Sequence, residues 1–253
     1  MAKRRHTRKK SRTGNLKRYL IAGSVLVALV VAYLGLKHYH IMFYDDVTPS
    51  AKYSVRGIDV SNHNGKVDFD AVASSGISFV YVKSSEGATF KDSKFRSNCR
   101  RAKAAGLHVG AYHFFRKDRD GELQARNMIA AAKGLDLDLP MVIDIEDADN
   151  ANSVPDRIVR NRLAGMSRVL KKAGYKVMIY TNGDGKRKYY DTTFKGEYLW
   201  LCALKDPDAV NHRGHVIQQF SHWGKCPGVK GKVDLNVFMG NGREWQKWLD
   251  EVN

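Results

Sequence analysis

Four acidic residues fall inside apolar segments of this 253-residue chain, where buried strands are normally uncharged. Asp144 and Glu146 end the run MVIDIE, Asp59 lies in GIDVS, and Asp234 lies in VDLNVF. A strand that is buried on both faces does not ordinarily hold a carboxylate. The four residues are therefore candidate catalytic groups.

Asp144 and Glu146 are two residues apart, so on a strand their side chains point to the same face. Their Cα atoms would lie roughly 6.6 Å apart, which suits two carboxylates acting on opposite sides of one scissile bond. Two close carboxylates also raise one pKa, which keeps an acid protonated near neutral pH. The alternative interpretation is structural, with these acids capping helices or pairing with Lys and Arg.

Aromatic residues within or just after the apolar segments add the second half of a sugar site, because sugar rings stack on aromatic faces. We expect Tyr112 and Tyr180 to bind substrate, and Trp200 is a third candidate that could equally belong to the core. His113 follows Tyr112 and should face the other side of its strand, which favours a structural role.

Eight short segments rich in Val, Ile, Tyr and Phe are predicted strands, separated in the first half by helical segments. The predicted strands are Arg56–Ser61, Phe79–Lys83, His108–Phe114, Met141–Ile145, Lys176–Thr181, Leu199–Ala203, Val216–Ser221 and Val233–Phe238. The predicted helices are Phe69–Ser75, Ser93–Ala105, Gly121–Lys133, Pro155–Ala173 and Arg243–Val252, and a glycine follows each of the first four.

This alternation favours an α/β fold with a parallel barrel, and a doubly wound open sheet is the alternative. The later strands are joined by shorter connections with a weak helical pattern, so the second half of the barrel should lack full helices. In such a barrel, residues at the carboxyl ends of the strands face the catalytic mouth. We therefore expect Asp144 and Glu146 there.

The N-terminal part has a different composition. Residues 1–18 contain nine Lys or Arg and no acidic residue, so of the formal net charge of +17, 17 minus 9 leaves +8 for the rest. Residues 19–36 are uncharged and would span roughly 27 Å as a helix, close to the ~30 Å core of a bilayer. No small-residue cleavage site follows, which favours an uncleaved anchor over a signal peptide or a buried core helix.

The positive-inside rule then places the N-terminus in the cytoplasm and exports the remainder. The predicted organisation is a basic cytoplasmic tail (1–18), a transmembrane anchor (19–36), a linker (37–54) and a barrel domain (55–253). This describes a single-pass protein of the cytoplasmic (inner) membrane with its barrel on the periplasmic or extracellular side. Binding of nucleic acid by the basic tail is the weaker interpretation, and no nucleic-acid partner is expected.

Other chemistries find little support in the residue pattern. The three cysteines, Cys99, Cys202 and Cys226, lack the spacing of a zinc or redox motif. Two of them could form one disulfide, or all three could be free thiols. The chain has no GxSxG, P-loop or HExxH motif. No metal or other cofactor is expected.

A resemblance to a known family rests on five segments in a fixed order: GIDVSNHNG, YVKSSEG, GAYHFF, PMVIDIE and the closing QFS…VKGKVDLNVF. Together they resemble glycoside hydrolase family 25, the Chalaropsis-type lysozymes or N-acetylmuramidases, over about residues 55–240. The resemblance implies an irregular TIM-like (β/α)5(β)3 barrel. It also implies a bacterial lysozyme that hydrolyses the β-1,4 bond between N-acetylmuramic acid and N-acetylglucosamine in peptidoglycan glycan strands.

The resemblance also implies roles for individual residues. Glu146 matches the family's proton donor, and Asp144 would stabilise positive charge at the anomeric carbon or orient the substrate's acetamido group. Asp59 and Asp234 would position substrate and tune the other carboxylates, and Glu86 matches a second-strand motif that would contact substrate. Retaining and inverting outcomes both stay open, and the 2-acetamido group of muramic acid allows substrate-assisted retention.

Residues 182–196 depart from the family, because they are polar and basic where an aromatic-rich loop is frequent. This leaves the sugar subsites open. The +8 of the exported part fits an anionic wall polymer, and the anchor suggests local wall remodelling. Two other function classes remain: a catalytically inactive barrel that binds glycan and recruits partners at the membrane, and a basic membrane protein that binds nucleic acid.

Overall fold

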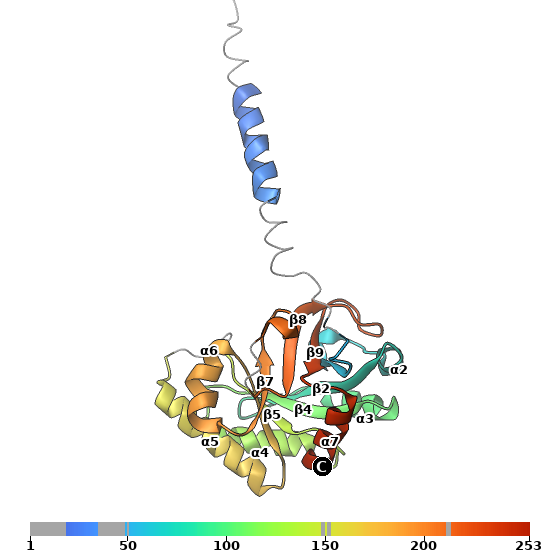
Figure 1. Ribbon diagram of the computed structural model, residues 1–253. Coiled ribbons are helices and arrows are strands. Elements are labelled where there is room, and N and C mark those ends of the chain that lie inside the picture. Colours follow the sequence, from blue (N-terminus) through green and yellow to red (C-terminus); the bar gives the residue numbers. More distant parts are fainter. Residues whose placement is uncertain (1–18, 35–48, 50, 148–149, 151–152, 211–213) are drawn as a thin grey trace, which may run out of the picture. The chain divides into compact units, whose positions relative to one another are not determined.

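The computed structural model describes residues 19–34, 49, 51–147, 150, 153–210 and 214–253 (Figure 1). The chain divides into two compact units, Met1–Asp45 and Asp46–Asn253. The predicted basic tail, residues 1–18, and most of the predicted linker lie outside the described residues.

The described part of the first unit is a helix over residues 19–34, whose residues are all exposed. No helix in the described ranges is both long and apolar enough to cross a membrane. The predicted 18-residue span is therefore not supported by the structure. The described helix would measure about 24 Å at 1.5 Å per residue, and residues 35–36 of the predicted span lie outside the described residues.

The second unit contains a closed barrel of eight strands, with the order β1-β9-β8-β7-β6-β5-β4-β2 and a final β1–β2 pairing. This closure excludes the open-sheet alternative. A two-residue strand, β3 (Phe90–Lys91), pairs with the end of β2 outside the barrel. The barrel strands are β1 (Arg56–Val60), β2 (Ile77–Glu86), β4 (His108–Phe114), β5 (Met141–Asp144), β6 (Val177–Asn182), β7 (Tyr198–Cys202), β8 (Ile217–Gly224) and β9 (Val233–Phe238).

Strand β9 departs from the predicted parallel arrangement, because it pairs antiparallel with both β8 and β1. The other barrel strands pair parallel. The prediction of an all-parallel barrel is therefore wrong at its last strand. Only residues 225–232 join β8 to β9, and a parallel crossover needs about a dozen residues or more, so the chain turns straight back.

Helical elements follow each of the first five barrel strands, whereas β7, β8 and β9 are not separated by an α-helix in the described residues. The polar stretch around residues 182–196, which the sequence suggested only as a loop, folds as the short helix α6 and a π-helix. The helical elements are α2 (Phe69–Ser74), α3 (Phe95–Ala104), α4 (Gly121–Ala132), α5 (Asp156–Lys172), α6 (Gly183–Gly185), the π-helix Lys186–Phe194 and α7 (Gly242–Val252), with short 3-10 turns at Asn62–Asn64 and Pro207–Ala209.

Alternation along β2 divides its side chains between two apolar clusters. Val80 and Val82 pack outward in the cluster that includes helix residues, whereas Phe79 and Tyr81 belong to the cluster inside the barrel. Trp245 of α7 stacks on Phe79 with ring centroids 5.3 Å apart. Helix α7 therefore packs against the end of the barrel where β2 begins. Figure 1 shows α7 as the last element of the chain.

Two glycines make room for these inward rings. A Cβ atom on Gly110 of β4 would lie 2.1 Å from the Tyr81 ring, and one on Gly57 of β1 would lie 2.2 Å from the Phe79 ring. Both ring positions are fully buried, so neither ring can swing out to solvent. The aromatic side chains that fill the barrel therefore require glycine at the paired positions of the two strands next to β2, β1 and β4.

We expect Gly110→Ala to lower the free energy of unfolding by about 1–3 kcal/mol, the usual cost of overpacking a close-packed core. The measurement is unfolding of the full chain in denaturant, monitored by tryptophan fluorescence. Gly242→Ala is the matched control, because nothing lies within 4 Å of its Cβ position and alanine is the better helix former. Equal stability of the Gly110→Ala variant and the wild type would show that the barrel interior is looser than described.

Candidate active site

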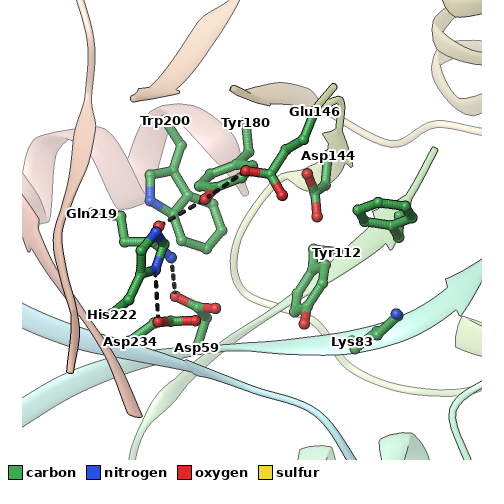
Figure 2. A pocket seen from close by; sticks show the side chains of 11 residues that line it. Asp59, Lys83, Tyr112, Asp144, Glu146, Tyr180, Trp200, Gln219, His222 and Asp234 are labelled. Atoms are coloured by element: carbon green, nitrogen blue, oxygen red, sulfur yellow. Dashed lines mark hydrogen bonds and ion pairs between the residues drawn. The ribbon is translucent and has the colours of Figure 1, made fainter. Parts of the chain in front are cut away.

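A pocket opens at the carboxyl ends of the parallel strands, and every barrel strand or the residues just after it contribute to its wall (Figure 2). It contains all four predicted carboxylates and the three predicted aromatic residues. The lining residues are Asp59, Lys83, Tyr112, Phe114, Asp144, Glu146, Tyr180, Trp200, Gln219, His222 and Asp234.

Local hydrogen bonds keep Asp144 and Glu146 on one face although β5 ends at Asp144. The backbone N–H of Ile145 donates to the Tyr180 carbonyl at 3.0 Å, and the Thr181 hydroxyl donates to the Ile145 carbonyl at 2.7 Å. The chain therefore stays extended past the strand. Figure 2 shows the two carboxyl groups side by side, as their spacing of two residues predicts.

Asp144 is buried, with 6% of its surface exposed. Its Oδ1 atom has no hydrogen-bond partner among the described residues. Burial, and after it the charge of Glu146, raises the pKa of Asp144 well above its usual value, while Lys83 acts in the opposite direction. A buried polar atom without a partner calls for an explanation, and a ligand group entering the pocket would supply one.

A chain of hydrogen bonds connects Glu146 to the opposite wall. The Tyr180 hydroxyl donates to Gln219 Oε1 at 2.7 Å and lies 3.5 Å from Glu146 Oε1. The Gln219 amide donates in turn to Asp59 Oδ2 at 2.9 Å. Tyr180 and Gln219 thus connect Glu146 on one side of the pocket to Asp59 on the other side.

Asp59 and Asp234 face each other across the antiparallel β1–β9 pair. Burial, and then the charge of Asp234, raises the pKa of Asp59 well above its usual value. Asp234 Oδ1 lies 2.9 Å from His222 Nδ1. This hydrogen bond is the largest of the effects that raise the pKa of His222 to about 10. His222 is therefore a cation at neutral pH, paired with the Asp234 carboxylate.

The predicted aromatic residues differ in access to the pocket. Trp200 packs against Tyr81 and Tyr180, with ring centroids 4.8 Å away in each case. It is 2% exposed and Tyr180 is 6% exposed, so these two form the pocket floor. Tyr112 is half-buried, as is its neighbour on β4, Phe114, and these rings offer the more open faces.

Glu86, the remaining predicted substrate residue, does not line the pocket. Its carboxylate accepts from Lys83 Nζ at 2.7 Å and from Arg116 Nε at 2.9 Å. Burial acts to raise the pKa of Glu86, but the hydrogen bonds from Lys83 and Arg116 outweigh it and the pKa lies below its usual value. Glu86 therefore holds Lys83, and Lys83 reaches the pocket.

The sequence pattern did not single out Lys83, Gln219 and His222, although all three line the pocket. Lys83 could have been found, because it lies two residues after the inward-facing Tyr81. His222 could not, because β8 shifts register twice against β9, between Gln219 and Ser221 and between Ser221 and Gly224. Each bulge adds a residue and breaks the inward–outward alternation.

The pocket chemistry is that of clustered carboxyl groups next to cations. Two of the four carboxyl groups, Asp59 and Asp144, have raised pKa values and can hold a proton. Lys83 acts against protonation of Asp144, and His222 is a cation in contact with Asp234. In the described part of the chain, no group of three or more His, Cys, Asp or Glu side chains could hold a metal ion. The arrangement can donate a proton and stabilise positive charge.

Comparison with known proteins finds the same family. The family model "Glycosyl hydrolases family 25" matches residues 58–229. The chain is 32% identical over 184 residues to an autolytic lysozyme of Clostridium acetobutylicum, covering 73% of this chain and 56% of that protein. It is 31% identical to lysozyme M1 of Streptomyces globisporus, covering 77% of this chain and 71% of that protein.

A solved structure of a family 25 glycosyl hydrolase from Bacillus anthracis superposes with a TM-score of 0.72 at 30% identity, covering 79% of this chain and 95% of that one. The match in fold thus extends over the barrel that carries the four carboxylates. The chain belongs to glycosyl hydrolase family 25.

Proposed function

We propose that this protein is a peptidoglycan hydrolase, a lysozyme that cleaves the β-1,4 bond between N-acetylmuramic acid and N-acetylglucosamine. The observation that carries the proposal is the pair of adjacent carboxyl groups, Asp144 and Glu146, in a pocket at the strand ends of the barrel. The names of the clostridial and streptomycete relatives, both lysozymes, support it.

In this proposal, Glu146 is the general acid. It protonates the departing glycosidic oxygen while the bond to the anomeric carbon breaks, and the Tyr180 hydroxyl 3.5 Å from Oε1 positions its carboxyl group. The two carboxyl groups share one proton, which the raised pKa of Asp144 places on Asp144 in the free protein. In this scheme substrate binding transfers that proton to Glu146, and Asp144, then the anion, stabilises the positive charge that develops on the sugar. Because two adjacent carboxyl groups resist double ionisation, the pair retains one proton into a range where isolated carboxyl groups have lost theirs.

Asp59 and Asp234 position the substrate in this scheme. Asp59 is held by the amides of Gln219 and Asn236, at 2.9 and 2.8 Å. Asp234 Oδ1 is held by His222 Nδ1 at 2.9 Å. Asp59, whose pKa is raised, can hold a proton and offer a hydrogen-bond donor to sugar hydroxyl and acetamido groups.

The first test replaces Glu146 by glutamine, which keeps the size but cannot donate the proton. We expect glycan cleavage to fall by about 10²- to 10⁴-fold, the usual contribution of a general acid. The measurement is digestion of purified peptidoglycan with mass spectrometry of the product ends. Wild type should release products with reducing-end muramic acid.

The matched control is Glu122→Gln, because Glu122 lies on the surface of α4 in ion pairs with Arg126 and Arg168. It should cleave like the wild type. Unchanged cleavage by the Glu146→Gln variant would remove Glu146 as the acid. Binding of peptidoglycan without cleavage by wild type would instead indicate the inactive glycan-binding barrel.

A second test uses the buried charge of Asp144. The folded protein holds the Asp144 proton more tightly than the unfolded chain, whose Asp pKa is about 3.9, so wild-type stability falls as pH rises from there through the raised pKa. Asp144→Asn removes this loss. As the pH rises, we expect the free energy of unfolding of the Asp144→Asn variant to increase relative to that of the wild type. We also expect the variant to cleave glycan more slowly than the wild type.

Denaturant unfolding at a series of pH values measures this difference. Asp136→Asn is the control, since that side chain is 86% exposed, and it should track wild type at every pH. A gap between the Asp144→Asn variant and wild type that stays constant with pH would show that Asp144 is not held in the protonated form.

We further propose that residues 19–36 attach the protein to the cytoplasmic membrane with its barrel exported. The support is chemical, because the described helix 19–34 exposes large apolar side chains such as Leu20, Val27 and Leu34. The full chain should sediment with membranes and resist a carbonate wash, and a chain that begins at residue 46 should not. Full-length protein in the soluble fraction would rule out the anchor.

A further inference from the structure

Cys202, His222 and Asp234 form a row of contacts beside the pocket. Cys202 ends β7, two residues after Trp200, and therefore lies on the inner face of the barrel. Its Sγ atom lies 3.7 Å from His222 Nε2, and the other ring nitrogen, Nδ1, lies 2.9 Å from Asp234 Oδ1. Thiol, imidazole and carboxylate thus follow one another in the order found at nucleophilic cysteines.

The imidazole ring of His222 connects the Cys202 thiol to the Asp234 carboxyl group in the pocket. Asp234 orients the ring and keeps it charged. An imidazolium beside a sulfur atom favours the thiolate, which is the nucleophilic form of cysteine.

The other two cysteines have different surroundings. Cys99 and Cys226 are buried and free. Burial raises the pKa of Cys99 to about 12 and also raises the pKa of Cys226. Neither contacts a histidine in the hydrogen bonds of the described residues. The structure thus separates one histidine-paired, half-buried thiol from two inert ones.

Cys202 lies directly behind a residue of the pocket wall, because its Sγ atom contacts His222 Nε2, and it is only half-buried. His222 lines that pocket, and its side chain is 37% exposed. The Asp144 Oδ1 atom, buried and without a partner in the described chain, faces the same space. A small polar molecule that enters the pocket therefore meets a polar atom without a partner in the described chain, and also the His222 ring that contacts the sulfur.

We propose that Cys202 is a covalent modification site, whose sulfur, paired with His222, reacts with peroxides that enter the pocket. The thiolate sulfur attacks one oxygen of hydrogen peroxide and the O–O bond breaks. The sulfur is oxidised by two electrons to a sulfenic acid, and the departing oxygen takes the Nε2 proton of His222 and leaves as water. Because His222 is already a cation, the proton of the thiol passes to solvent when the thiolate forms. His222 regains a proton from solvent after the step, so the overall reaction turns one thiol and one hydrogen peroxide into one sulfenic acid and one water.

The modification has a consequence that rests on the proposed lysozyme function. A sulfenic acid on Cys202 is bulkier than the thiol and would push against the ring of His222, which lies 3.7 Å from the sulfur. His222 holds Asp234, so the site that positions substrate would be disturbed. Oxidation of one thiol should then slow glycan cleavage.

The first experiment measures the thiol directly and needs no lysozyme activity. The full chain at pH 7 is treated with limiting iodoacetamide, and mass spectrometry quantifies the adduct on each cysteine. Cys202 should be alkylated at least about tenfold faster than Cys99 and Cys226, and the three should react alike in denaturant. His222→Asn, checked for an unchanged unfolding transition, should slow labelling of Cys202 severalfold. Equal labelling of the three native thiols, or no effect of His222→Asn, would overturn the proposal.

The second experiment measures the consequence. Hydrogen peroxide should form a dimedone-reactive sulfenic acid on Cys202 and lower glycan cleavage at least about fivefold, and thiol reductant should restore it. Cys202→Ala should cleave glycan like the wild type and lose the sensitivity. Oxidation of Cys202 without loss of cleavage would overturn the regulatory consequence. If wild type cleaves no glycan, the lysozyme proposal fails while the labelling result still decides the modification site.

Discussion

Closure of the barrel by one antiparallel strand is the constraint on which this structure depends. β9 lies between β8 and β1 and pairs antiparallel with both. Without it the sheet would keep two open edges and no enclosed mouth. The same pairing sets Asp234 opposite Asp59 and brings Asn236 to Asp59 across 177 positions of chain. The fold and half of the acidic site therefore come from a single pairing.

The pocket concentrates charge that the fold must tolerate. Asp59 and Asp144 are each less than 10% exposed, at 8% and 6%, and an isolated buried carboxylate is costly. The chain offsets this in two ways: amide donors hold Asp59, and the His222 and Lys83 cations lie beside the acids. Asp144 keeps a polar atom without a partner in the described chain. Such a destabilised group is expected where binding or catalysis requires it.

The aromatic filling connects the core to the site. Trp245 and Phe79 close one end of the barrel, and Tyr81 and Trp200 continue the packing to the pocket floor. Trp200 ends this column with its indole N–H donating to Asn236 at 2.9 Å. A side chain that the sequence offered as a sugar platform thus serves as support, because its ring is enclosed by its neighbours.

Several features followed from the sequence alone. The alternation of apolar strands and helices, with a glycine after each of the first four helices, predicted all eight barrel strands. Two of them are longer than predicted, because β2 extends to Glu86 and β8 to Gly224. The spacing of Asp144 and Glu146 predicted a shared face, because alternation along a strand is a local property. His113 was likewise predicted away from the pocket, and it is buried against Ser85 and Gln124 on the outer side.

Other features were decided only by the tertiary structure. The direction of β9, the two bulges that turn His222 inward and the placement of Glu86 with Lys83 and Arg116 depend on which strand lies next to which. A sequence pattern shows which residues are apolar and at what spacing they recur. It does not show the register between strands that are far apart in the chain. The sequence therefore determined the barrel strands and the acidic pair, and long-range pairing decided the rest of the site.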